Sequence, residues 1–225
     1  MQKLVEGLHK FQSEVFAPRR DFFTSLARGQ HPETLFITCS DSRVAPNLIT
    51  QTDPGELFIL RNAGNIIPAF TEGGVACGET ATIEFAIEAL GVSSIVVCGH
   101  TACGAMKALL DPTPLERLPS VRQWLSHAEP TRKRVLENYA DRDPATLGTL
   151  MVEENVLTQI EHLHTHPVVK SRLLEGKLAI YAWVYKIETG DVFQFDAATG
   201  QFEKLGAQAV ARATNGREAR VAASI

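Results

Sequence analysis

The stretch that decides the fold is "LFITCSDSR", residues 35–43. An apolar run comes first, and a thiol, a carboxylate and a guanidinium follow within five positions. The pattern returns in "SIVVCGHTAC", residues 94–103, where a second apolar run is followed by an imidazole and another thiol. Because both runs are short and bounded by polar residues, we interpret them as buried strands with reactive side chains at their carboxyl ends.

A third strand and a helical pattern separate these two strands. The strand is "GELFILRN" (55–62), and apolar residues then recur at helical spacing until Gly91. The residues on this helical face are Ala76, Thr80, Ile83, Ile87 and Leu90. Alternation of strand and helix predicts parallel strands with helices on both faces of the sheet.

The C-terminal part predicts a hairpin. "LAIYAWVYKI" (178–187) is a strand pattern, "ETGDV" is a turn, and "FQF" is positioned to pair back. The expected fold class is therefore α/β, with a mostly parallel central sheet, an antiparallel edge strand and flanking helices. Asp143-Pro144 marks the start of one helix, because Asp caps free amides and Pro fits the first turn.

Residues 1–30 are expected to form a helical arm. Their apolar residues recur at helical spacing up to Pro18, which interrupts the pattern. Such a helix has no obvious place in a doubly wound core, so we expect it to pack on a partner subunit. Residues 1–205 are expected to form a single α/β domain, and the Ala-rich residues 206–225 a loosely held tail.

The composition is that of a soluble globular protein. Of 225 residues, 44% are hydrophobic and 21% charged, and the net charge of −4 favours neither nucleic acid nor an anionic membrane as a partner. We find no signal peptide and no apolar run near the roughly 18 residues of a membrane span. The four cysteines are expected to be thiols in a reducing compartment, which predicts a cytoplasmic location.

Cys39, His100 and Cys103 form a candidate metal site. The spacing H-x-x-C brings two ligands to one turn, and Cys39 joins them if its strand lies beside that of residues 94–98. Two thiolates and an imidazole are a zinc-type donor set, and three protein ligands leave one position open, as in catalytic zinc sites. On spacing alone, an equal alternative is that these residues are structural or accidentally placed.

Asp41 and Arg43 follow Cys39 at intervals of two. A carboxylate beside zinc either binds the metal or accepts a hydrogen bond from a ligand of the metal. A bidentate pair with Arg43 decides between these outcomes. The alternative, equally weighted on the bare sequence, is a surface ion pair that contributes little.

The motifs "CSDSR", "PGELF", "RNAGN", "IEFAI" and "CGHTACGAMK" resemble those of the β-class carbonic anhydrases in order and spacing. The resemblance extends from about residue 20 to about residue 195. It implies zinc-dependent, reversible hydration of CO2 to bicarbonate and a proton by attack of zinc-bound hydroxide. It also implies that Zn2+ is bound by Cys39, His100 and Cys103, and that Asp41 and Arg43 form the catalytic dyad.

The same resemblance implies a substrate site. Gln30 and the backbone amide of Gly104 match substrate-binding positions, and Phe58 and Ala63 match the apolar wall of the CO2 pocket. The family's active site lies at a subunit interface, which implies a homodimer or a higher homo-oligomer. Gln30 and the pocket wall then serve the neighbour's zinc.

"NLITQ", "RNAGNIIP" and "ENVLTQIE" are most similar to the cyanobacterial, carboxysome-associated branch, and we expect the chain to lack the long C-terminal extension of that branch. A carboxysome is therefore an alternative location. Some family members have an inactive state in which the Asp binds zinc. Phe36 and Thr38 replace residues typical of that branch, so we expect Asp41 to remain on Arg43. Rival functions are hydrolysis of CS2 or carbonyl sulfide on the same scaffold, and a scaffold protein with structural zinc.

Overall fold

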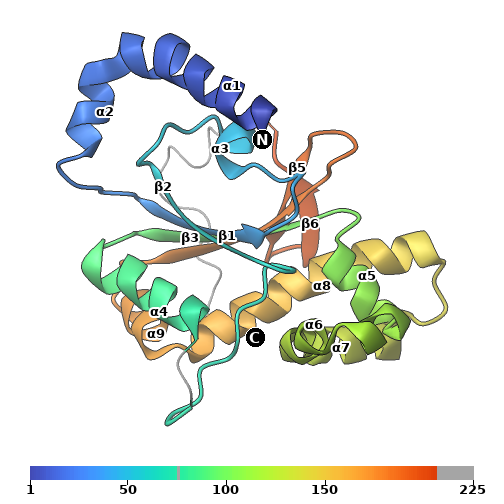
Figure 1. Cartoon of the computed structure of the whole chain (residues 1–225). Coiled ribbons are helices and arrows are strands. Elements are labelled where there is room, and N and C mark those ends of the chain that lie inside the picture. Colours follow the sequence, from blue (N-terminus) through green and yellow to red (C-terminus); the bar gives the residue numbers. More distant parts are fainter. Residues whose placement is uncertain (75–76, 207–225) are drawn as a thin grey trace.

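The computed structural model describes residues 1–74 and 77–206, which form one mixed sheet with helices on both sides (Figure 1). The strand order is β2-β1-β3-β4-β5-β6; β1 to β4 run parallel, and β5 and β6 are antiparallel to their neighbours. The strands are β1 (Thr34–Cys39), β2 (Leu57–Asn62), β3 (Ser94–His100), β4 (Ala179–Tyr185), β5 (Val192–Asp196) and β6 (Gln201–Lys204). The predicted α/β fold with a parallel centre and an antiparallel edge is confirmed.

One face of the sheet carries the main core. Alternate strand residues such as Leu35, Ile37 and Val97 are fully buried there, against α8 and its neighbours. The long helix α8 begins as expected at Pro144, and the carboxylate of the preceding Asp143 accepts hydrogen bonds from the amides of Ala145 and Thr146. The helices are α1 (Gln2–Lys10), α2 (Arg20–Leu26), α3 (Pro46–Thr50), α4 (Gly78–Glu84), α5 (Gly104–Leu110), α6 (Pro119–Leu125), α7 (Glu129–Tyr139), α8 (Pro144–Thr165) and α9 (Pro167–Leu174).

Gly99 lets α8 pack directly on the centre of the sheet. A Cβ atom at this position would lie 2.8 Å from Val156 and 3.0 Å from Val152, both on α8. These distances are shorter than an ordinary carbon–carbon contact, so a larger residue would push the helix away from β3. The close approach sets the position of α8 beside the end of β3, where His100 lies.

The opposite face has a smaller core of Phe36, Val96 and Cys98, with Trp183 packed edge-on against Phe36. In Figure 1 the N-terminal arm arches over this face. The regular helix of the arm is interrupted around Pro18, as predicted, and Arg19 there has non-helical dihedral angles (φ −114°, ψ 26°). The chain passes from α1 through a π-helical turn (Phe11–Phe16) and a 3-10 turn (Ala17–Arg19) into α2. The 3-10 turn accommodates proline in its first positions and separates α1 from α2.

Two other expectations fall at the limits of the described residues. The helix predicted from Ala76 begins at Gly78 and continues as a π-helical turn (Phe85–Ala89), and residue 76 itself lies outside the described residues. Of the tail predicted at 206–225, residues 207–225 likewise lie outside them. Among the described residues, no helix combines the length and the hydropathy that crossing a membrane requires.

Candidate metal centre

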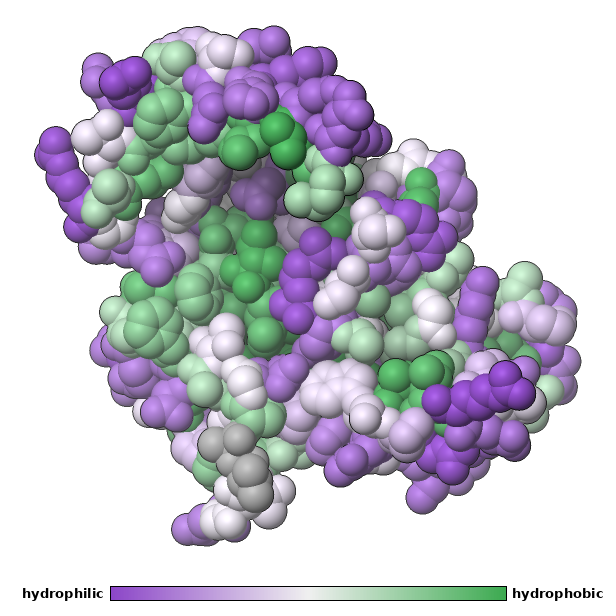
Figure 2. Space-filling view, in the orientation of Figure 1, coloured by the Kyte–Doolittle hydropathy of each residue, from purple (hydrophilic) through white to green (hydrophobic). Residues whose placement is uncertain are grey.

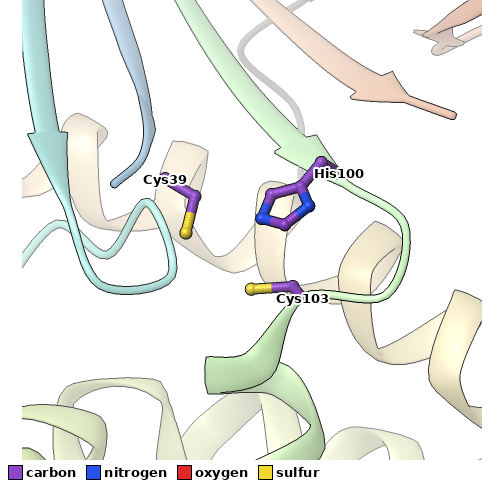
Figure 3. Close-up of side chains that lie close together, drawn as sticks. All are labelled: Cys39, His100 and Cys103. Atoms are coloured by element: carbon purple, nitrogen blue, oxygen red, sulfur yellow. The ribbon is translucent and has the colours of Figure 1, made fainter. Parts of the chain in front are cut away.

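Three predicted ligands meet at the carboxyl ends of two neighbouring strands (Figure 3). Cys39 is the last residue of β1 and His100 the last of β3, and these strands pair in parallel. Cys103 precedes α5, after a tight turn in which Ala102 has a left-handed φ of 55°. The candidate ligand atoms of all three residues lie within 4.8 Å of one another, and all three residues are buried.

The imidazole of His100 is oriented for a cation. Its Nδ1 lies 2.9 Å from the carbonyl oxygen of Thr101, and because a carbonyl only accepts, Nδ1 carries the proton. Nε2 is therefore a lone-pair donor, and it finds no hydrogen-bond partner among the described residues although His100 is fully buried. Buried polar atoms are rarely left unpaired, so this nitrogen fits a metal ligand.

The two thiols fit the same interpretation. The neighbouring thiol of Cys103 lowers the pKa of Cys39 to about 4. A second thiolate in the same buried place would repel the first, so the pKa of Cys103 is raised. A divalent cation offsets this repulsion and lets both sulfurs bind as thiolates. Two thiolates and a neutral imidazole are the donor set of zinc.

Asp41 and Arg43 form a bidentate ion pair beside these ligands. Asp41 Oδ1 accepts from both Nε and the backbone amide of Arg43 at 2.9 Å, and Oδ2 accepts from Nη2 at 2.8 Å. These bonds hold the pKa of Asp41 well below its usual range. Asp41 Oδ2 also lies 3.9 Å from His100 Nε2, so the carboxylate faces the candidate metal centre.

Known proteins share this fold and sequence. The sequence model of the carbonic anhydrase family matches residues 34–192. A carbonic anhydrase of Synechococcus elongatus is 54% identical over 86% of this chain and 71% of its own length. The structure of the β-carbonic anhydrase CcaA is 49% identical, with a TM-score of 0.88 over 91% of this chain and 99% of that one.

The chain belongs to the β-class carbonic anhydrase family. A more distant solved relative is described as one of two tetrameric β-carbonic anhydrases from Sordaria macrospora. It is 28% identical, with a TM-score of 0.73 over 86% of this chain and 95% of that chain. The resemblance inferred from the motifs is thereby confirmed, and the activity of the chain is that of a carbonic anhydrase.

Residues outside the predicted ligand set hold the loops of this carbonic anhydrase in place. Arg61 donates to the carbonyl oxygens of Cys39 and Asp41, at 2.9–3.0 Å, and so clamps the backbone on both sides of Ser40. Thr101 donates to Glu188 at 2.6 Å and accepts from the amide of Ile187, which ties the turn after His100 to the β4–β5 hairpin. The motif "RNAGN" drew attention to Arg61, but no sequence signal pairs Thr101 with Glu188.

Among the predicted substrate residues, Ala63 and Gly104 lie near the ligands. Ala63 directly follows β2, at the same edge of the sheet as Cys39. Gly104 follows Cys103 as the first residue of α5, and a Cβ atom there would meet nothing within 4 Å.

Gln30 and Phe58 lie near the other end of the strands. Gln30 precedes β1, and the six residues of this strand separate its start from Cys39 by about 17 Å. Phe58 pairs in register with Leu35, at the start of β1, and packs against Phe85. The structure therefore does not bring either side chain to the Cys–His–Cys group of its own chain.

The remaining cysteines and histidines have other surroundings. Cys98 belongs to the opposite face of the sheet, where burial raises its pKa to about 12. Cys77 precedes α4 and lies 3.3 Å from the hydroxyl of Thr80. His162 and His166 lie at hydrogen-bond distance from the carbonyl oxygens of residues 67 and 68.

Proposed function

We propose that this β-carbonic anhydrase binds zinc through Cys39, His100 and Cys103 and catalyses the reversible hydration of CO2 under the control of an Asp41–Arg43 dyad. The observation that carries the proposal is the buried thiol–imidazole–thiol group whose His100 Nε2 has no partner among the described residues. The carboxylate that faces this nitrogen at 3.9 Å supports a role for Asp41 beside the metal. Three protein ligands leave one position open for chemistry.

Zinc, when bound, supplies a Lewis acid that lowers the pKa of a coordinated water and so provides the nucleophile for CO2. The hydration consumes one water and one CO2 and yields bicarbonate and a proton. Asp41 remains ionised because Arg43 holds its pKa low, and an ionised carboxylate only accepts hydrogen bonds. Beside a bound metal, Asp41 would therefore accept a hydrogen bond only from an oxygen that carries a proton. Arg43 stays protonated and aligns Asp41 without taking part in proton transfer.

The substrate pocket is proposed to contain residues of two chains. The amide of Gly104 and the methyl group of Ala63 lie near the ligands of the same chain, where they support contacts with bicarbonate and CO2. Gln30 and Phe58 lie near the opposite end of β1 and β2. We propose that they line the pocket of a neighbouring subunit, so that the complete site needs two copies of the chain.

The surface of the arm supports a homodimer or a larger homo-oligomer. Leu4 and Leu8 are 69% and 54% exposed, and Figure 2 shows a hollow between the arm and the body with hydrophobic residues along it. Exposed apolar surface of this kind is typical of protein–protein contacts. The tetrameric relative supports the same proposal. Leu4→Ser combined with Leu8→Ser is expected to reduce the molar mass measured by light scattering.

Two broader proposals rest on the sequence. Residues 1–205 are proposed to act as one catalytic domain, with residues 1–30 as its arm. The similarity to the cyanobacterial branch supports a location in the cytoplasm or in a carboxysome. Fractionation of cells that express the tagged chain, with carboxysomes purified separately, tests the second proposal.

The function is tested by stopped-flow CO2 hydration on samples of known zinc content, beside an assay with CS2. Hydration of CO2 in proportion to bound zinc is expected. Release of sulfide from CS2 without hydration of CO2 would overturn the proposed substrate. Zinc held by four protein ligands in X-ray absorption spectra would overturn the open site.

A further inference from the structure

A pair of buried amide side chains on α8 holds the segment that follows β2. Asn155 Nδ2 donates to the carbonyl oxygen of Gly64 at 3.0 Å, and its Oδ1 accepts from Gln159 Nε2 at 2.9 Å. Gln159 Oε1 in turn accepts from the amide of Ile67 at 2.8 Å. Both side chains are at most 1% exposed, and buried amides are costly unless they are hydrogen-bonded. The pair therefore fixes the position of residues 64–67.

The segment held by α8 contacts a proposed zinc ligand. The amide of Gly64 donates to the sulfur of Cys39 at 3.4 Å. The backbone here is unusual, because Gly64 has a φ of 85° and Asn65 a φ of 48°. A Cβ atom at Gly64 would also lie 2.9 Å from the Cβ atom of Ala105 on α5, so the segment is closely packed. Without external hydrogen bonds, this orientation of the Gly64 amide is not expected to persist.

Trp124 binds the peptide unit of the Gly64 amide through the carbonyl oxygen of that unit. Its Nε1 donates to the carbonyl oxygen of Ala63 at 2.8 Å. This carbonyl and the N–H of Gly64 belong to one peptide unit, so Trp124, the peptide and Cys39 form a chain of hydrogen bonds. A hydrogen bond accepted by the carbonyl polarises the peptide and strengthens the bond that its N–H donates.

We propose that Asn155 and Gln159 are positioning residues for the metal centre: they hold the Gly64 amide against the Cys39 sulfur, and this amide withdraws charge from the thiolate. A thiolate that donates less charge leaves a bound metal more electrophilic. The inference rests on the proposed role of Cys39 as a ligand. Through Asn155 and Gln159, α8 would then affect the metal as well as pack on the sheet.

The test uses the full chain with cobalt(II) in place of zinc, because the thiolate-to-cobalt charge-transfer band reports charge donation by sulfur. Asn155→Leu and Gln159→Met keep the side-chain size and remove the hydrogen bonds. Each is expected to shift the band to longer wavelength. Each is also expected to speed hydrogen exchange of the Gly64 amide by about tenfold, the effect of one lost hydrogen bond.

Thr158→Val is the matched control. Thr158 is fully buried on the same helix, and its hydroxyl has no hydrogen-bond partner in the described part of the chain. This variant is expected to leave the band and the Gly64 exchange rate unchanged. A comparable band shift in Thr158→Val would show that any change in the α8 interior moves the spectrum, and it would overturn the proposal.

Trp124→Phe is an independent test of the Gly64 amide. Trp124 lies outside α8 and is only half-buried, so its replacement disturbs the core less. It is expected to shift the band in the same direction, and it decides the matter if the α8 variants fail to fold. An unchanged band in a folded, cobalt-loaded Gln159→Met or Trp124→Phe protein would overturn the proposal. A wild-type cobalt form without any thiolate band would instead remove the metal site on which the proposal rests.

Discussion

Replacement of Asp41 by Asn separates control of the reaction from metal binding. The carboxylate accepts three hydrogen bonds from Arg43, two at Oδ1 and one at Oδ2. An amide cannot accept all three, because in either orientation its NH2 group faces a donor of Arg43. The pair is then broken, and the acceptor-only group beside His100 is lost. We expect kcat for CO2 hydration to fall by about 100-fold, the usual cost of losing one positioned hydrogen-bonding group in an active site.

The assay is stopped-flow hydration at several CO2 concentrations, with zinc measured in the same samples. Zinc content is expected to remain at the wild-type level, since Asp41 is not one of the three proposed ligands. Asp53→Asn is the matched control, because Asp53 makes a similar bidentate pair with Arg19 on the arm. We expect that variant to keep its turnover. Wild-type turnover in Asp41→Asn, or loss of its zinc, would refute the proposed division of labour.

Three further predictions concern the metal, the pH profile and the core. Cys103→Ser is expected to lose zinc and activity together in a metal assay, and full zinc with full activity would contradict its role as a ligand. Hydration is expected to rise from neutral toward alkaline pH, because two thiolates make zinc a weaker Lewis acid than three neutral ligands do; a flat profile from about pH 6 to about pH 9 would exclude this. Burial raises the pKa of Cys98 to about 12, so the folded state keeps a proton that the unfolded state loses. The free energy of unfolding should therefore fall above about pH 9, by up to about 1.4 kcal/mol per pH unit. Cys98→Ala should show a shallower fall in denaturant titrations, and an identical slope would rule out this cause.

The parallel centre of the fold was predictable because its signals are local. Residues 35–38 and 94–98 are apolar runs of strand length, and their reactive side chains come directly after them. Strand β6 was not predicted, because Gln201–Lys204 has a single apolar residue; its position depends on pairing with β5, where Phe202 packs against Phe195.

The site was predictable where a short motif carries several of its residues. Cys39, Asp41 and Arg43 lie within five positions, and the structure brings them beside His100 and Cys103. The residues that hold the surrounding loops were not assigned, because their partners are distant in sequence. Trp124 meets Ala63 across 61 positions and Asn155 meets Gly64 across 91, and no sequence periodicity indicates such pairs.

The central claim is that CO2 is hydrated at a metal bound by Cys39, His100 and Cys103. The most direct measurement follows the hydration rate and the bound zinc in one sample as a chelator removes the metal and zinc is then restored. We predict that the rate falls and recovers in proportion to bound zinc, with one zinc per chain at full activity. Hydration that persists in the zinc-free chain, or a fully zinc-loaded chain that does not hydrate CO2, would contradict the claim.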